Sequence, residues 1–359
     1  MRHRIPALLL FPIICLSALA AYAQTGQAPS SSNGREVPAR TIPVPATASA
    51  ELQQQIARPV APTLRLMQTT SPKSAEEWKQ LAALLNGQAA QMLAQIRKAF
   101  PVKIESGTMG GVKVYTVAPE AIPAENRNRA LVHLHGGGYV LWGGEVAAGE
   151  AILLAHYAKM KVISVDYRMP PDHPFPAAVD DAVAVWKEAI KTTKPGNTGL
   201  GGTSAGGGLT LAVVHRLKEL KLPLPGAIFG GTTWADLART GDSVRTNENL
   251  DDVVPTHDGL LDAMARVYAG KEDLKHPLIS PLYGNFKGFP PAILVTGTRD
   301  LLLSDTVRVH RKLRQAGVEA ELHVFEGLSH GEYFILFDAP ESKDAWTEVA
   351  GFFARHLSR

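Results

Sequence analysis

Short apolar segments alternate with helix-like stretches along most of this chain, and that alternation most constrains its fold. Turn residues bound the apolar segments, and their length is typical of buried strands. The predicted strands are Val112–Val117, Ala130–His135, Lys161–Asp166, Thr198–Gly202, Ala227–Gly230, Ala292–Gly297 and Glu321–Phe325. The predicted helices are Val146–Met160, Ala177–Lys191, Ala205–Leu220, Asp305–Ala316 and Ser342–His356. The pattern predicts an α/β fold with a mostly parallel sheet covered by helices on both faces.

The N-terminus has the three parts of a secretory signal peptide. A basic start, Met1–Arg4, precedes an apolar run, Ile5–Ala20, and small residues follow at Ala21 and Ala23. We therefore expect residues 1–23 to be removed after Ala23, and the protein to be exported to the periplasm or the medium. The alternative is an uncleaved anchor, but the run is short beside the roughly 20 residues that span a bilayer. No membrane span is expected after cleavage.

The single cysteine and the charge balance exclude several kinds of site. Cys15 lies in the leader, and Ile14 before it is not the small residue that lipoprotein processing prefers. The mature chain would then lack a thiol nucleophile, a disulfide or a cysteine metal site. The formal net charge is only +3, and no basic run stands out, which argues against nucleic acid as a partner.

The domain organisation follows from changes in composition. Residues 24–50 are rich in Pro, Ser, Thr, Ala and Gly, which predicts a flexible linker before one domain at 51–359. Apolar residues at helical spacing predict two helices within 51–100. Residues 232–282 interrupt the strand–helix pattern and contain a predicted helix at Gly259–Tyr268. We expect 51–100 and 232–282 to form a cap over the site.

A glycine-flanked serine marks the candidate nucleophile. The segment Gly202-Thr203-Ser204-Ala205-Gly206 lies between a predicted strand and a predicted helix. This strand–turn–helix context is the one in which a G-x-S-x-G motif exposes a serine hydroxyl. The same five letters also occur as an ordinary glycine-rich turn, so the assignment of Ser204 depends on that context.

A second glycine-rich segment, His135 to Gly138, ends another predicted strand. Successive glycines let a loop turn its N–H groups toward a substrate, where side chains would obstruct it. We expect the N–H groups of Gly137, Gly138 and Ala205 to form an oxyanion hole. His135 is expected to brace the loop. His133 and His135 could form a metal pair, but no third ligand is apparent, so no metal is expected.

The general base and its orienting acid are expected after the serine, with the acid first. His330 lies in Gly327–Gly331, directly after a predicted strand, and is the best placed of the twelve histidines. Asp300 follows another strand and would hold one tautomer of the imidazole. Asp305 is the rival acid, although it is better explained as part of a helix start.

Two aromatic residues beside the glycine loop are candidate substrate contacts. Tyr139 and Trp142 either shape the pocket or pack in the core, and the sequence favours neither. The pocket itself is expected to be apolar with few polar anchors. A small capped pocket favours short- to medium-chain acyl groups.

Taken together, these blocks resemble the hormone-sensitive-lipase-like branch of the α/β-hydrolases. The matching blocks are His135–Tyr139, Asp166–Arg168 with Asp172–Ala178, Gly202–Gly207, Asp300 with Asp305, and Ser329–Gly331. The resemblance implies an eight-stranded sheet, a helical cap and hydrolysis of carboxylic esters without a cofactor. It also makes a homodimer an expected state, since members often dimerise. Thr203 departs from the aspartate that many members carry, which puts the contacts behind the nucleophile in doubt.

Two classes of function are then compatible with the sequence. The first is a serine carboxylesterase that uses Ser204, His330 and Asp300; a lactone hydrolase or an amidase would use the same three residues. The second is a ligand-binding homologue without catalysis, since fold does not imply function. The complete set of three residues and the glycine loop favour the enzyme, with a small ester or lactone as its substrate.

Overall fold

One eight-stranded sheet lies at the centre of the structure, a computed structural model that describes residues 34, 37–59 and 67–358. The strands are β1 (Val102–Met109), β2 (Val112–Pro119), β3 (Ala130–Leu134), β4 (Lys161–Val165), β5 (Thr198–Thr203), β6 (Ala227–Gly231), β7 (Ala292–Gly297) and β8 (Ala320–Phe325). Their order is β1-β2-β4-β3-β5-β6-β7-β8. The β1–β2 and β2–β4 pairs are antiparallel, and the other pairs are parallel. The predicted mostly parallel α/β fold is confirmed.

Strand β1 is the strand of the sheet that the sequence pattern did not reveal. It pairs along its whole length with β2, from Val102 opposite Pro119 to Met109 opposite Val112. Most of its residues are exposed or only partly buried, because it is an edge strand. Its sequence therefore lacks the apolar run by which the buried strands were recognised.

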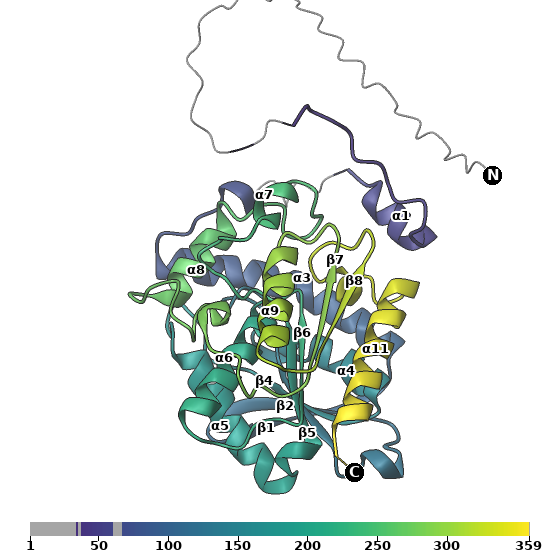
Figure 1. Cartoon of the computed structure of the whole chain (residues 1–359), viewed down its shortest axis with the longest axis vertical. Coiled ribbons are helices and arrows are strands. Elements are labelled where there is room, and N and C mark those ends of the chain that lie inside the picture. Colours follow the sequence, from purple (N-terminus) through teal and green to yellow (C-terminus); the bar gives the residue numbers. More distant parts are fainter. Residues whose placement is uncertain (1–33, 35–36, 60–66, 359) are drawn as a thin grey trace, which may run out of the picture. The chain divides into compact units, whose positions relative to one another are not determined.

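Helices cover both faces of the sheet (Figure 1). The α-helices are α1 (Ala50–Ile56), α3 (Ala75–Ala99), α4 (Gly149–Ala158), α5 (Ala177–Thr192), α6 (Ala205–Glu219), α7 (Ser243–Thr246), α8 (Leu260–Ala269), α9 (Leu303–Gln315), α10 (Glu332–Ile335) and α11 (Pro340–His356). Helices α5, α6 and α9 pack on one face, and α4 and α11 pack on the other. Short 3-10 helices are η1 (Ala124–Asn126), η2 (Gly144–Ala148), η3 (Pro195–Asn197) and η4 (Pro281–Tyr283). Two apolar clusters separate the sheet from its two helical layers.

Burial on both faces explains why the central strands are apolar. All five residues of β3 are buried, and Val132 at its middle lies between Ile163 on β4 and Leu200 on β5. Parallel strands end at the same edge of a sheet, so the loops after β3, β5, β7 and β8 come together there. These are the loops that carry the glycine segment, Ser204, Asp300 and His330.

The linker prediction was wrong at its C-terminal end. Residues 24–50 were expected to be flexible, but the compact unit begins at Val44. The hydroxyl of Thr47 donates to Glu326, and Ser49 both caps α1 and donates to Glu341. Glu326 and Glu341 lie 279 and 292 residues from these partners along the chain, which composition does not reveal. The predicted leader, 1–23, lies outside the described residues.

The two segments predicted as a cap contain the expected helices. Helices α1 and α3 lie within 51–100, apart from the first residue of α1. Helix α8 corresponds to the helix predicted at Gly259–Tyr268 and begins and ends one residue later. The side chain of Ser49 accepts a hydrogen bond from the N–H of Leu52, and that of Ser74 accepts one from the N–H of Glu77. These caps fix where α1 and α3 begin. Among the described residues, no helix combines the length and apolar character that crossing a membrane requires.

Candidate active site

The turn between β5 and α6 holds Ser204 in a strained conformation. Its φ of 61° and ψ of −123° lie outside the regions that most residues adopt. Its N–H donates to the carbonyl of Gly231 on β6, at 2.8 Å. A Cβ at Gly202 or Gly206 would lie 1.9 Å from the carbonyl oxygen of Leu134, so both glycines are sterically required. The predicted nucleophile therefore stands on the expected strand–turn–helix.

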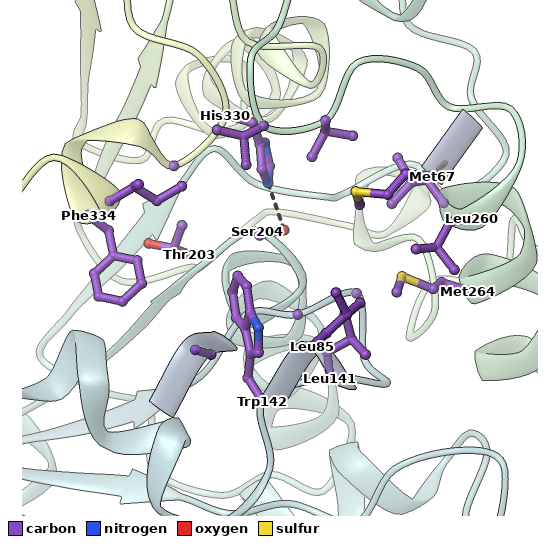
Figure 2. A pocket seen from close by; sticks show the side chains of 18 of the residues that line it. Met67, Leu85, Leu141, Trp142, Thr203, Ser204, Leu260, Met264, His330 and Phe334 are labelled. Atoms are coloured by element: carbon purple, nitrogen blue, oxygen red, sulfur yellow. Dashed lines mark hydrogen bonds between the residues drawn. The ribbon is translucent and has the colours of Figure 1, made fainter. Parts of the chain in front are cut away.

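Ser204, His330 and Asp300 form one continuous hydrogen-bonded chain. The Oγ of Ser204 lies 2.8 Å from Nε2 of His330, as Figure 2 shows, and Nδ1 of His330 lies 2.9 Å from Oδ1 of Asp300. An ionised carboxylate only accepts hydrogen bonds, so Nδ1 carries the proton and Nε2 is free to accept the serine proton. The structure thus brings together the three residues predicted for catalysis.

Asp300 is fully buried and held at both carboxylate oxygens. Oδ2 accepts from the hydroxyl of Thr296 at 2.6 Å, and Oδ1 also accepts from the N–H of Leu302 at 2.8 Å. Burial lowers the pKa of His330, but the charge and hydrogen bond of Asp300 outweigh it, with a further contribution from Asp251. The net result is a raised pKa, so the environment favours the imidazolium form that a general base passes through.

The rival acid, Asp305, faces a different part of the fold. Its Oδ2 accepts from the N–H groups of Ala235 and Asp236, at 3.0 and 2.8 Å. It lies in the first turn of α9, as the sequence suggested, and among the described residues its side chain makes no hydrogen bond to His330. Burial raises the pKa of Asp305 well above its ordinary value.

The glycine loop after β3 lies beside the serine. Gly137 and Gly138 have φ values of 95° and 62°, in the region that favours glycine. Among the described residues, no acceptor is found for the N–H groups of Gly137, Gly138 or Ala205. Gly137 and Gly138 line the same cavity as Ser204. Three unpaired donors around a nucleophile are what an oxyanion hole requires.

His135 braces this loop from behind. Its Nδ1 donates to the carbonyl of Gly136 at 2.8 Å, and its ring stacks on Tyr167 with centroids 4.1 Å apart. The hydroxyl of Tyr167 in turn donates to the carbonyl of His135 at 2.7 Å. Burial lowers the pKa of His135 to about 3, so this imidazole stays neutral at ordinary pH.

An apolar cavity of about 330 Å³ surrounds Ser204. Figure 2 shows Met67, Leu260 and Met264 on one side of the serine and Phe334 on the other. Both predicted cap segments contribute to its wall. From 51–100 come Met67, Leu85, Gln88, Ala89 and Met92, and from 232–282 come Val253, Val254, Pro255, Thr256, Leu260, Leu261 and Met264. The sequence had not singled out these wall residues, because their contribution depends on how the cap folds.

Of the two predicted substrate contacts, Trp142 lines the cavity and Tyr139 does not. Tyr139 is buried, with 1% of its surface exposed, and stacks on Tyr268 at a centroid distance of 3.8 Å. Tyr139 directly follows two glycines with positive φ and itself has a φ of 65°. This backbone conformation turns its side chain into the core. Leu141, two residues on, lines the cavity instead.

Comparison with known proteins agrees with this geometry. Residues 131–334 match the family described as the alpha/beta hydrolase fold. The chain belongs to the α/β-hydrolase family. This α/β-hydrolase is 35% identical to an acetyl-hydrolase of Streptomyces hygroscopicus over 234 residues, which cover 65% of this chain and 77% of that protein. It is 30% identical to an esterase of Acinetobacter venetianus over 280 residues, or 73% of this chain and 86% of that one.

Solved structures place this α/β-hydrolase in a branch of the family. The crystal structure of esterase E25 is 44% identical, with a TM-score of 0.88, and covers 91% of this chain and 100% of that one. An esterase from the bacterial hormone-sensitive lipase family is 28% identical, with a TM-score of 0.72, and covers 86% of this chain and 99% of that one. The hormone-sensitive-lipase-like resemblance seen in the sequence is confirmed.

A buried polar network lies behind the nucleophile, where this α/β-hydrolase has threonine. The hydroxyl of Thr203 donates to Oε1 of Glu150 on α4 at 2.7 Å and lies 2.6 Å from the hydroxyl of Tyr333. The other oxygen of Glu150 lies 3.4 Å from Nε2 of His133. The sequence analysis missed Glu150, because no local motif marks it. The carboxylate of Glu150 also accounts for the buried His133, which packs beside it rather than pairing with His135.

A third acidic residue, Asp251, approaches the catalytic pair. One ligand atom each from Asp251, Asp300 and His330 lies within 4.8 Å of the others, a spacing that could hold a metal ion. However, Nδ1 of His330 is already hydrogen-bonded to Asp300, and both oxygens of each carboxylate accept hydrogen bonds. The arrangement fits a hydrogen-bonded network around the imidazole better than a metal site.

Proposed function

We propose that this protein is a serine carboxylesterase in which Ser204, His330 and Asp300 act as nucleophile, base and orienting acid. The observation that carries the proposal is their continuous hydrogen-bonded chain in an apolar cavity that Gly137 and Gly138 also line. The names of the relatives, esterase and acetyl-hydrolase, support the same reaction class. No cofactor is part of the proposal.

In the first half of the reaction, the Oγ of Ser204 bonds to the ester carbonyl carbon while its proton passes to Nε2 of His330. The electron pair of the C=O bond moves to oxygen, and the N–H groups of Gly137, Gly138 and Ala205 stabilise the oxyanion. When the C=O bond re-forms, the C–O bond to the alcohol breaks. The leaving alkoxide takes the proton from His330, and an acyl-enzyme remains.

In the second half, a water molecule repeats these steps on the acyl-enzyme. His330 removes a proton from the water as its oxygen bonds to the acyl carbon. Collapse of the second oxyanion breaks the bond to Ser204, whose oxygen regains the proton from His330. The products are one carboxylic acid and one alcohol, and the enzyme returns to its starting state.

The cavity favours small esters as substrates. Its volume of about 330 Å³ and its wall of Met, Leu, Trp and Phe side chains match short- to medium-chain acyl groups. His330 is the only titratable side chain among the described cavity residues, and its ring is already engaged in the catalytic chain. A charged substrate would therefore find no oppositely charged partner in the cavity. We therefore expect neutral esters of low molecular weight.

The decisive experiment replaces Ser204 with Ala and measures hydrolysis of p-nitrophenyl acetate and butyrate. We expect kcat to fall by at least about 10⁴-fold, because the acyl-enzyme cannot form. Ser106→Ala, at an exposed position on β1, is the matched control and should retain full activity. Undiminished turnover in Ser204→Ala would overturn the assignment, and wild-type protein that does not react with a fluorophosphonate probe would support a binding protein instead. Including lactones and amides in the panel tests the same catalytic residues on those substrates.

We further propose that the protein is exported after cleavage at Ala23, because the first 23 residues have the order of a signal peptide. Mass spectrometry of protein recovered from the periplasm or medium of a bacterial host should give a chain that begins at Gln24. Ala23→Phe should block this cleavage. An unprocessed chain in the membrane fraction would contradict the proposal. Light scattering of the mature chain tests the proposed homodimer.

A further inference from the structure

Asp251 lies in the segment between α7 and α8 and is buried, with 3% of its surface exposed. Its carboxylate accepts four backbone hydrogen bonds. Oδ1 accepts from the N–H groups of Val253 and Val254, each at 2.8 Å. Oδ2 accepts from the N–H of Leu301 at 2.7 Å and from the N–H of His330 at 3.2 Å. A carboxylate that accepts from four donors has all its lone-pair directions in use.

These four donors belong to three loops that meet only at the site. Val253 and Val254 are part of the cavity wall, Leu301 directly follows the catalytic acid, and His330 is the catalytic base. Asp251 is 50 residues from Leu301 and 79 from His330 along the chain. One side chain therefore fixes the cavity wall, the acid loop and the base loop against each other.

The charge of Asp251 also acts on the catalytic imidazole. Burial and then the charge of Asp300 raise the pKa of Asp251 to about 7, while His330 and the backbone N–H groups oppose that rise. The charge of Asp251 in turn contributes to the raised pKa of His330. The other charged neighbours are Glu332, whose pKa burial raises to about 7, and Asp252 beside Arg299.

We propose that Asp251 is a positioning residue that joins the cavity wall to the catalytic pair and stabilises the imidazolium of His330. It does not touch the reacting atoms, and it acts through the backbone N–H of His330 and through its charge. This inference rests on the proposed esterase function. It implies that acyl transfer depends on a carboxylate from the cap as well as on the three residues of the hydrogen-bonded chain.

The test is Asp251→Asn in the full chain, assayed over a pH series with p-nitrophenyl butyrate. An amide cannot accept all four hydrogen bonds and carries no charge, so the base loop shifts and kcat is expected to fall by about 10²-fold. Loss of the negative charge that Asp251 carries above pH 7 lowers the pKa of His330, so the acid limb of kcat/KM is expected to move to lower pH. A merely structural role would lower the melting temperature without moving that limb.

Two further variants make the result decisive. Asp252→Asn removes the neighbouring, partly buried carboxylate and should leave kcat within twofold of wild type and the acid limb unmoved. Asp251→Glu keeps the charge, so its acid limb should stay at the wild-type pH even if kcat falls; this variant decides the question if Asp251→Asn does not fold. Wild-type kcat and an unmoved limb in Asp251→Asn, or a moved limb in Asp251→Glu, would overturn the inference. Fluorophosphonate labelling of Ser204 in wild type separates these outcomes from failure of the esterase proposal itself.

Discussion

Replacing Asp300 with Asn tests the role of the acid in a way that the structure makes quantitative. The amide can place its oxygen at the Oδ1 position, where it accepts from both Leu302 and His330. Its NH₂ group then faces the hydroxyl of Thr296, which can rotate to accept. The imidazole therefore keeps its tautomer in Asp300→Asn, and the loss of activity reports the charge alone.

The size of that loss follows from Coulomb's law. With 2.9 Å between Nδ1 and Oδ1, the centres of the imidazolium and carboxylate charges are about 4 Å apart. At an effective dielectric constant of about 20, the lost attraction is about 4 kcal/mol in the transition state. That energy corresponds to a fall in kcat of about 10³-fold. A reversed tautomer would cost more, about 10⁴-fold.

The assay is steady-state hydrolysis of p-nitrophenyl butyrate at a pH where the wild type is fully active, with folding checked by circular dichroism. Asp305→Asn is the matched control, because it changes the rival acid, which is equally buried. Burial already raises the pKa of Asp305 well above its ordinary value, so an uncharged amide is a close replacement. We expect its kcat within threefold of wild type. A loss below tenfold in Asp300→Asn, or an equal loss in Asp305→Asn, would refute the reasoning.

Three other predictions concern the base, the glycine loop and the network behind the nucleophile. The charge of Asp300 raises the pKa of His330, so the acid limb of kcat/KM should lie above pH 6.5 and activity should fall as pH drops through it; a limb below 6.5 would contradict this. A Cβ at Gly138 would lie 2.4 Å from Sδ of Met264, so Gly138→Ala should displace an oxyanion donor and lower kcat by about 10²-fold with little change in KM. In Thr203→Asp, the new carboxylate would face Glu150, whose Oε1 lies 2.7 Å from the hydroxyl of Thr203 in the wild type. Denaturant unfolding should show a free energy of unfolding lower by about 1–3 kcal/mol, largely restored when Glu150→Gln is added. No restoration would contradict like-charge repulsion.

The three residues proposed for catalysis could be picked out from the sequence because each follows a strand that the sequence also reveals. Ser204, Asp300 and His330 stand just beyond buried apolar runs, and parallel strands end at one edge of the sheet. The fold class was predictable for the same reason, since strands buried on both faces leave a strong apolar signal. Strand β1 lacks that signal because it lies at an edge.

The surroundings of the site could not be predicted, because they depend on side-chain direction and on contacts between distant segments. Tyr139 and Leu141 are both apolar neighbours of the glycine loop, and only the left-handed backbone decides which of them faces the cavity. Glu150 and Asp251 sit 53 and 50 residues from the groups that they bind, Thr203 and Leu301. Neither carboxylate belongs to a local motif, so the sequence alone does not distinguish them from surface acids.

The backbones of the nucleophile and the base are anchored to different parts of the fold. A movement of the cap is therefore expected to displace one more than the other. Ser204 is held within the sheet layer, by its N–H bond to Gly231 on β6 and by the start of α6. His330 is held through Asp251 to the same segment that supplies Val253 to the cavity wall. Displacement of that segment would therefore move the base while the serine turn kept its geometry. We therefore expect a substrate that packs against this wall to stabilise the position of the base, which would couple recognition of the acyl chain to proton transfer.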